Sequence, residues 1–112
     1  LRASLPLGHV APFLAELESQ WPAAGAIAQA LTGTIRAAGP LEPAAGAALV
    51  RHLRAVATAL GGWLVVERAP LALKEQVDVW GPPAGPLELM RRLKQAYDPA
   101  GIMNHGRFVG GL

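Results

Sequence analysis

Cysteine is absent from this sequence. Without thiols the chain forms no disulfide, holds no iron–sulfur cluster through cysteine and offers no thiol nucleophile. Aromatic residues are scarce, at 5% of the chain, and its ten basic residues are scattered without forming a run. A nucleic-acid-binding surface needs a basic patch and aromatic platforms for the bases. The sequence therefore disfavours nucleic acid as a partner.

Charged residues are also few, at 16%, whereas 52% of the sequence is hydrophobic. A chain of 112 residues forms one domain with a modest core, so this composition predicts apolar surface left over for a partner. Every apolar run is interrupted well before the roughly 18 residues that a membrane span requires. There is no signal-peptide pattern, and the sequence begins with Leu1 instead of Met. We therefore expect a piece of a longer protein with no membrane span.

Hydrophobic periodicity predicts alternating strands and helices. We expect a short strand over residues 1–5, a helix from about Val10, one bulged strand or two short strands over residues 26–36, a helix over 44–60 and a strand over 63–67. This β-α-β-β-α-β order is that of a ferredoxin-like domain, in which both helices cover one face of an antiparallel sheet. The predicted fold class is α+β, a ferredoxin-like sandwich with an added C-terminal helix and tail.

The added helix is expected over residues 87–97, started by Pro86, after a segment that is mostly loop with one short helical stretch. Asp98-Pro99 ends it, because proline cannot continue a helix. Its buried side is predicted to consist of five apolar residues: Leu89, Met90, Leu93, Ala96 and Tyr97.

The tail after this helix carries the most specific pattern in the chain. It reads Asp98-Pro99-Ala100-Gly101-Ile102-Met103-Asn104-His105-Gly106-Arg107. This resembles the Asp-Pro-x-Gly-Ile-Leu-Asn-Pro-Gly-Arg/Lys ending of FAD-linked oxidases of the vanillyl-alcohol oxidase type, with Met103 for Leu and His105 for Pro. The resemblance implies a C-terminal, substrate-side cap domain whose FAD is bound mainly by an upstream domain. It also implies that Asn104, His105 and Arg107 contribute to cofactor binding.

A metal-binding motif of this family is changed here. In its metal-dependent 2-hydroxyacid dehydrogenases a strand carries His-Ala-Gly-Asp-Gly-Asn-Leu-His, and the matching residues 29–36 place Gln29 and Arg36 at the two histidine positions. Arginine stays protonated and offers a metal no lone pair, so we predict no metal. Arg36 either binds the carboxylate of a substrate or partner or is a solvated residue at a strand end.

The family's Glu-His-Gly-Ile-Gly motif matches Glu67-Arg68-Ala69-Pro70. In relatives the glutamate is a metal ligand and the histidine a candidate base, a role that a permanently protonated arginine cannot take. Glu67 and Arg68 are then a structural ion pair or a clamp for an anion. No catalytic residue is assigned from the sequence, and the candidates are His105, Arg68 and Arg36.

Other segments resemble one branch of the family, whose members are the FAD-binding subunit of a glycolate-oxidising complex. They are residues 65–70, Lys74, residues 78–81 and residues 106–112. The resemblance implies a small 2-hydroxyacid as substrate, and a related flavoprotein subunit and an iron–sulfur subunit as partners. It also implies a cytoplasmic location at the inner face of the membrane, through the complex. Glu67, Lys74 and Trp80 are the candidates for substrate or subunit contacts.

Residues 78–83 are expected to form a rigid loop. Its Trp80 lines the flavin pocket, forms a subunit contact or anchors a connector in the core. His9 and His52 have no second ligand nearby in the sequence and are expected to be packing or surface residues.

Two other functions stay open. One is a metal-independent FAD-linked 2-hydroxyacid dehydrogenase domain that holds the substrate carboxylate with Arg36 or Arg68. The other is a non-enzymatic ferredoxin-like module that binds a small ligand or dimerises through its sheet. In every enzymatic interpretation the isolated chain is expected to be inactive, since the flavin is bound mainly elsewhere.

Overall fold

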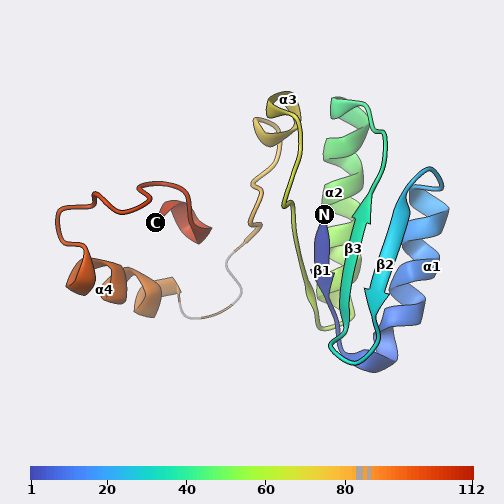
Figure 1. The fold of residues 1–112 in the computed structure, drawn as a ribbon, viewed down its shortest axis with the longest axis horizontal. Coiled ribbons are helices and arrows are strands. Elements are labelled where there is room, and N and C mark those ends of the chain that lie inside the picture. Colours follow the sequence, from blue (N-terminus) through green and yellow to red (C-terminus); the bar gives the residue numbers. More distant parts are fainter. Residues whose placement is uncertain (83–84, 86) are drawn as a thin grey trace. The chain divides into compact units, whose positions relative to one another are not determined.

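The computed structural model describes residues 1–82, 85 and 87–112, which form two compact units, Leu1–Val79 and Trp80–Leu112 (Figure 1). The first unit contains, in chain order, β1 (Arg2–Ser4), the 3-10 turn η1 (Leu7–His9), α1 (Val10–Gln20), β2 (Gly25–Gln29), β3 (Thr34–Ala38), α2 (Pro43–Ala59), β4 (Trp63–Val65) and α3 (Leu71–Lys74). The second contains α4 (Leu87–Tyr97) and the 3-10 turn η2 (Val109–Gly111). No helix in the described ranges is long and apolar enough to cross a membrane.

The sheet of the first unit has the strand order β2-β3-β1-β4, and every neighbouring pair is antiparallel. Both this order and the β-α-β-β-α-β sequence of elements confirm the predicted ferredoxin-like α+β fold. Of the two alternatives for residues 26–36, the structure has two strands, joined by a turn that ends at Gly33. β4 ends at Val65, sooner than expected, and the Val66 N–H donates to the carbonyl of Val79.

The core lies between the sheet and the two long helices, which cover one face of it (Figure 1). Ala3, Ile35 and Leu64 lie opposite one another on three neighbouring strands and are fully buried. The helices complete this core with Phe13 and Leu17 from α1, and with Leu49, Val50, Leu53 and Ala57 from α2. The opposite sheet face is left without helices and carries the side chains of Arg2 and Arg36.

Two glycines allow the chain to pass close to the end of β1. Gly33 has a φ of +67°, and a Cβ built there would lie 1.9 Å from the carbonyl oxygen of Leu5. Gly62 follows α2, where its N–H donates to the carbonyl of Ala57, and a Cβ there would lie 2.3 Å from the carbonyl oxygen of Ser4. Any side chain at either position would force the backbone apart.

The second unit confirms the bounds predicted for its helix, residues 87–97, whereas the expected start at Pro86 lies outside the described residues. The prediction of a buried side on this helix is wrong. No residue of α4 is buried, Leu89 and Leu93 are half exposed, and Tyr97 is 82% exposed. One amphipathic helix and an irregular tail supply too few apolar groups to cover each other, so the stripe of Leu89, Met90, Leu93, Ala96 and Tyr97 stays open within this unit.

Candidate functional site

Asp98 organises the tail that follows α4. One oxygen of its carboxylate, Oδ1, accepts the N–H of Ile102 at 3.0 Å, and Oδ2 accepts the N–H of Met103 at 3.0 Å and Lys94 Nζ at 2.5 Å. Lys94 Nζ also donates to the carbonyl of Met103. The Asp98 side chain is only 5% exposed. The hydrogen bond from Lys94, followed by those from the two backbone N–H groups, lowers the pKa of Asp98 from 3.8 to about 2.

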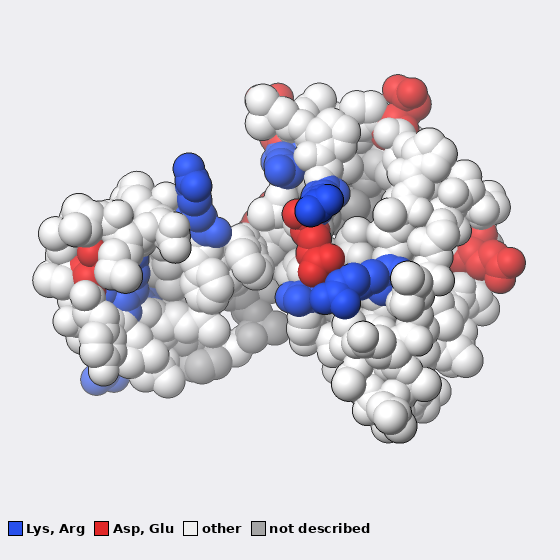
Figure 2. Space-filling view, viewed as in Figure 1, with Lys and Arg blue, Asp and Glu red and all other residues white. Residues whose placement is uncertain are grey.

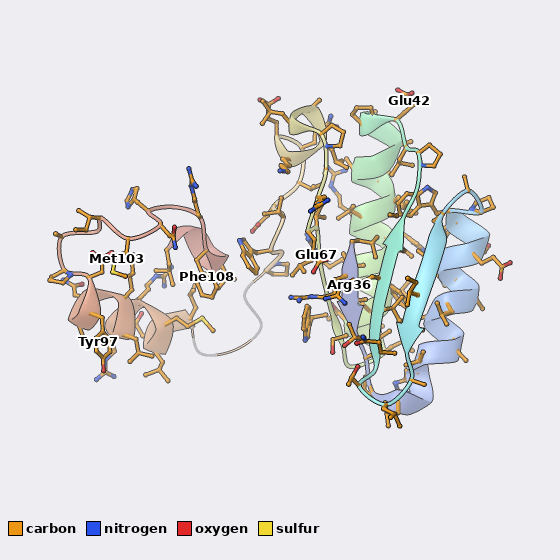
Figure 3. All side chains as sticks on the ribbon, in the orientation of Figure 1. Arg36, Glu42, Glu67, Tyr97, Met103 and Phe108 are labelled. Carbon is orange, nitrogen blue, oxygen red and sulfur yellow. The ribbon has the colours of Figure 1, made fainter. Side chains whose placement is uncertain are left out.

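Beside this carboxylate, α4 and the tail border a cavity of about 630 Å³ that is open to solvent on one side. Its apolar lining comes from Met90, Leu93, Tyr97, Met103, Phe108 and Leu112, and its polar lining from Lys94, Asp98, Asn104 and Arg107. Figure 3 shows Tyr97 on the helix and Met103 and Phe108 on the tail. A few polar groups in a mainly apolar hollow of this size are typical of a small-molecule site.

Trp80 contacts the tail at Arg107 and Phe108. Its indole Nε1 donates to the carbonyl of Arg107 at 3.2 Å, and its ring meets that of Phe108 edge-on, with 5.2 Å between the centroids. Such aromatic pairs add to the stabilisation from buried area. Within the second unit, Trp80 therefore anchors the tail. Pro83, the end of the predicted rigid loop, lies outside the described residues.

The three candidates for cofactor binding have different positions. Asn104 and Arg107 line the cavity, whereas His105 is exposed and is not part of its lining. Asn104 has a φ of 48°, a left-handed conformation that asparagine tolerates better than most residues. Asp98, which the sequence presented as a helix stop and the first residue of the tail motif, gives the tail this shape together with Lys94, which the sequence did not single out.

A second group of polar side chains lies on the open face of the sheet in the first unit. Glu67 Oε1 lies 3.5 Å from Arg2 Nη1, and Glu67 Oε2 lies 3.5 Å from Arg36 Nε. Basic and acidic side chains adjoin on the face seen in Figure 2, and Figure 3 shows Arg36 and Glu67 directed toward each other. The Arg2 guanidinium also lies over the ring of Trp63, 5.3 Å from its centroid.

Strand register creates this cluster, because Arg2 on β1 is directly opposite Arg36 on β3. Like charges in such positions repel, and the carboxylate of Glu67 offsets the repulsion. Each arginine reaches Glu67 through one long contact instead of a paired fork, so donors remain on both guanidinium groups. Arg2 Nε is buried and has no hydrogen-bond partner among the described residues. The cluster therefore offers several donors and one acceptor.

The other candidates in this unit, Arg68 and Lys74, form no ion pair with the cluster in the part of the chain that the structure describes. Glu67 pairs with Arg2 and Arg36, and the described structure shows no ion pair between Glu67 and Arg68. Arg68 and Lys74 are both exposed. The described residues include no group of three histidine, aspartate or glutamate side chains arranged to bind a metal.

The two remaining histidines hold helices in place. His52 Nε2 on α2 lies 2.6 Å from Glu16 Oε1 on α1, a contact that lowers the pKa of Glu16. His9 Nδ1 lies 2.8 Å from the carbonyl oxygen of Leu60, just after α2. Both are exposed residues that also contact a neighbouring element, in line with the packing or surface role expected from the sequence.

Comparison with known families gives one result for this chain. Residues 80–108 match the family model of FAD linked oxidases, C-terminal domain. The matched segment runs from Trp80 through α4 to Phe108 and includes every residue that lines the cavity except Leu112. The match supports an FAD-linked oxidase C-terminal domain, and with it a flavoprotein oxidoreductase that uses FAD. Comparisons with curated proteins and with solved structures gave no match.

Proposed function

We propose that this chain is the C-terminal cap domain of the FAD-binding E subunit of bacterial glycolate oxidase. In that role it contributes to a flavin site during the oxidation of glycolate to glyoxylate within a multi-subunit complex. The observation that carries the proposal is the family match over residues 80–108, in the segment that folds around the cavity. The resemblance of residues 65–70 and 78–81 to that branch supports the choice of glycolate oxidase.

The cavity residues fit the ring system of a flavin in chemical character. Tyr97, Met103 and Phe108 offer flat or flexible apolar walls, and Asn104 and Arg107 offer hydrogen-bond donors for carbonyl oxygens or ring nitrogens. Lys94 is already engaged with Asp98 and keeps the tail in position. Bound FAD would supply the capacity to accept a hydride from the substrate carbon. In this proposal most FAD contacts come from an upstream domain.

The proposed partners are those of the branch: a related flavoprotein subunit and an iron–sulfur subunit, which pass electrons toward the respiratory chain. A cytoplasmic location at the inner face of the membrane belongs to the same proposal. The open apolar stripe of α4 supports a partner or domain contact, because exposed apolar stripes of this kind are typical of interaction surfaces.

The cluster of Arg2, Arg36 and Glu67 favours a second candidate, in which this chain itself binds the hydroxyacid without a metal. Guanidinium donors suit the substrate carboxylate, and the Glu67 carboxylate suits the hydrogen of the adjacent hydroxyl. A 2-hydroxycarboxylate presents one acceptor group and one donor group side by side. The cluster is complementary to that arrangement.

The first experiment is to purify the full-length protein without its partners and record the flavin absorbance before and after anaerobic addition of glycolate. Bound flavin that stays oxidised supports a cap or relay role in the complex. Bleaching supports the second candidate. Purified, folded protein without flavin would overturn the assignment to FAD-linked oxidases.

Substitutions in the same protein distinguish the two positions proposed for the substrate carboxylate, which are the cluster containing Arg36 and the exposed Arg68. If the cluster binds substrate, the double substitution of Arg2 and Arg36 by glutamine raises the glycolate concentration needed for bleaching at least about ten-fold, because truncating one side of a charged hydrogen bond costs more than about 1.4 kcal/mol. Arg68→Gln tests the other arginine proposed for the carboxylate, and if the cluster binds the substrate this variant should leave that concentration unchanged, because Arg68 is exposed and forms no ion pair with the cluster in the described structure. Equal effects of both variants would count against the cluster.

A further inference from the structure

β2 forms one edge of the sheet, and that edge is uncovered. All five of its residues, Gly25–Gln29, are exposed, and the side chain of Ile27 is 74% exposed. β2 pairs with β3 on one side, and no other strand among the described residues pairs with its outer side. Alternate N–H and C=O groups of an antiparallel edge strand point outward, where they are free to pair with another strand.

This edge lacks the features by which soluble proteins block edge pairing. Lysine, proline, bulges and very short strands are the usual ones. β2 contains no proline, no charged residue occurs between Glu18 and Arg36, and β2 pairs with β3 in unbroken register over its whole length. The opposite edge differs, because β4 has three residues and the chain beyond it is bonded to Val79. Only the β2 edge of this sheet is ready for strand addition.

We propose that β2, the edge strand of the sheet in Figure 1, pairs antiparallel with β2 of a second copy of this chain, joining two sheets edge to edge. The strand is complementary to itself about Ile27. Ile27 then lies opposite its own copy, Ala26 lies opposite Ala28, and Gly25 leaves room for the longer Gln29. β-branched side chains pack well against cross-strand neighbours on a pleated sheet.

Electrostatics does not oppose a second copy of the chain. Arg36 is the cross-strand partner of Ile27, so it is the first charged residue on the open face behind this edge. In the joined sheet the two Arg36 residues are three strand spacings apart, roughly 14 Å, which exceeds the Debye length of about 8 Å at physiological ionic strength. Their repulsion is therefore mostly screened. β2 itself offers no charge with which to select a charged foreign strand.

Sedimentation velocity over a concentration series tests the proposal, with the full chain and two variants. Ile27→Lys places two ammonium groups opposite each other at the centre of the paired strands, and we expect the dimer dissociation constant to rise at least about ten-fold. Leu31→Lys is the matched control. Leu31 is 93% exposed in the turn after β2, so this variant makes the same chemical change outside the paired strand, and it should leave the constant unchanged.

A wild-type chain that stays monomeric at every concentration would overturn the proposal. So would an equal weakening by both variants, because it would indicate association through scattered apolar residues and not through the strand.

Crosslinking tests the register. The chain has no cysteine, so Ile27→Cys introduces one reporter thiol per copy. Directly opposite Cβ atoms lie about 4.5–5.5 Å apart, within reach of a short bismaleimide. We expect rapid covalent dimer from Ile27→Cys and little from Leu31→Cys. A faster reaction at position 31, or an Ile27→Cys chain that associates without crosslinking, would contradict the pairing.

Discussion

Replacing Glu67 with glutamine should destabilise the first unit by about 1–2 kcal/mol. Glu67 forms two partly exposed ion pairs at 3.5 Å, and such pairs contribute about 0.2–1 kcal/mol each. The substitution also leaves Arg2 and Arg36 facing each other without a neutralising charge, which adds a repulsion of similar size. For a domain of this size, a loss of 1 kcal/mol lowers Tm by roughly 4–8 °C.

Urea unfolding at low and high ionic strength measures this effect. At about 0.01 M salt the Debye length is about 30 Å, and at about 1 M it is about 3 Å, so the difference between wild type and Glu67→Gln should shrink strongly as salt is added. Glu18→Gln is the control, because Glu18 is an exposed glutamate of α1 without an ion pair in the described structure. This variant should unfold like the wild type at both salt concentrations.

Two outcomes would refute this explanation of the cluster. If Glu67→Gln were as stable as the wild type at low salt, the carboxylate would not neutralise the two arginines. If it lost the same free energy at both salt concentrations, the loss would come from packing or hydrogen bonding and not from charge.

Three further substitutions and one titration test other parts of the structure. The pKa of Asp98 in the folded chain is lowered from 3.8 to about 2. Its contribution to the stability of the tail is therefore fully present above about pH 4 and is lost as the pH falls through about 2. Amide hydrogen exchange of the tail, measured over this pH range, would follow the loss. Asp98→Asn should release the tail and speed tryptic cleavage after Arg107, and an unchanged cleavage rate would contradict the role given to this carboxylate. Gly33→Ala should lower the free energy of unfolding in urea by more than about 2 kcal/mol, because the added Cβ meets a backbone oxygen in a left-handed turn. An unchanged free energy would mean that the turn relaxes freely. Leu53→Ala should lower the free energy of unfolding by about 2–5 kcal/mol, because Leu53 is fully buried. The exposed control, Leu31→Ala, should change it by less than about 0.5 kcal/mol. Equal losses would contradict the placement of the core.

The fold class and most element bounds followed from the sequence because their causes are local. Apolar spacing set the buried faces of α1 and α2, and glycines marked the turns beside β1. The Asp-Pro stop ended α4 where it was expected. The prediction for α4 failed in one respect: an apolar stripe indicates a face that can be buried, but whether a partner covers it depends on the rest of the fold.

The sequence by itself thus determined the α+β order, the resemblance of the tail and the cofactor-binding candidates Asn104, His105 and Arg107, whose role stays a prediction. Only the tertiary structure brought Arg2, Arg36 and Glu67 together, because strand register joins residues that are far apart along the chain. It also showed that Asp98, beyond ending α4, is a buried carboxylate whose hydrogen bonds to the tail shape the cavity. Periodicity reports which face of an element is apolar, whereas register and turn geometry decide which side chains meet.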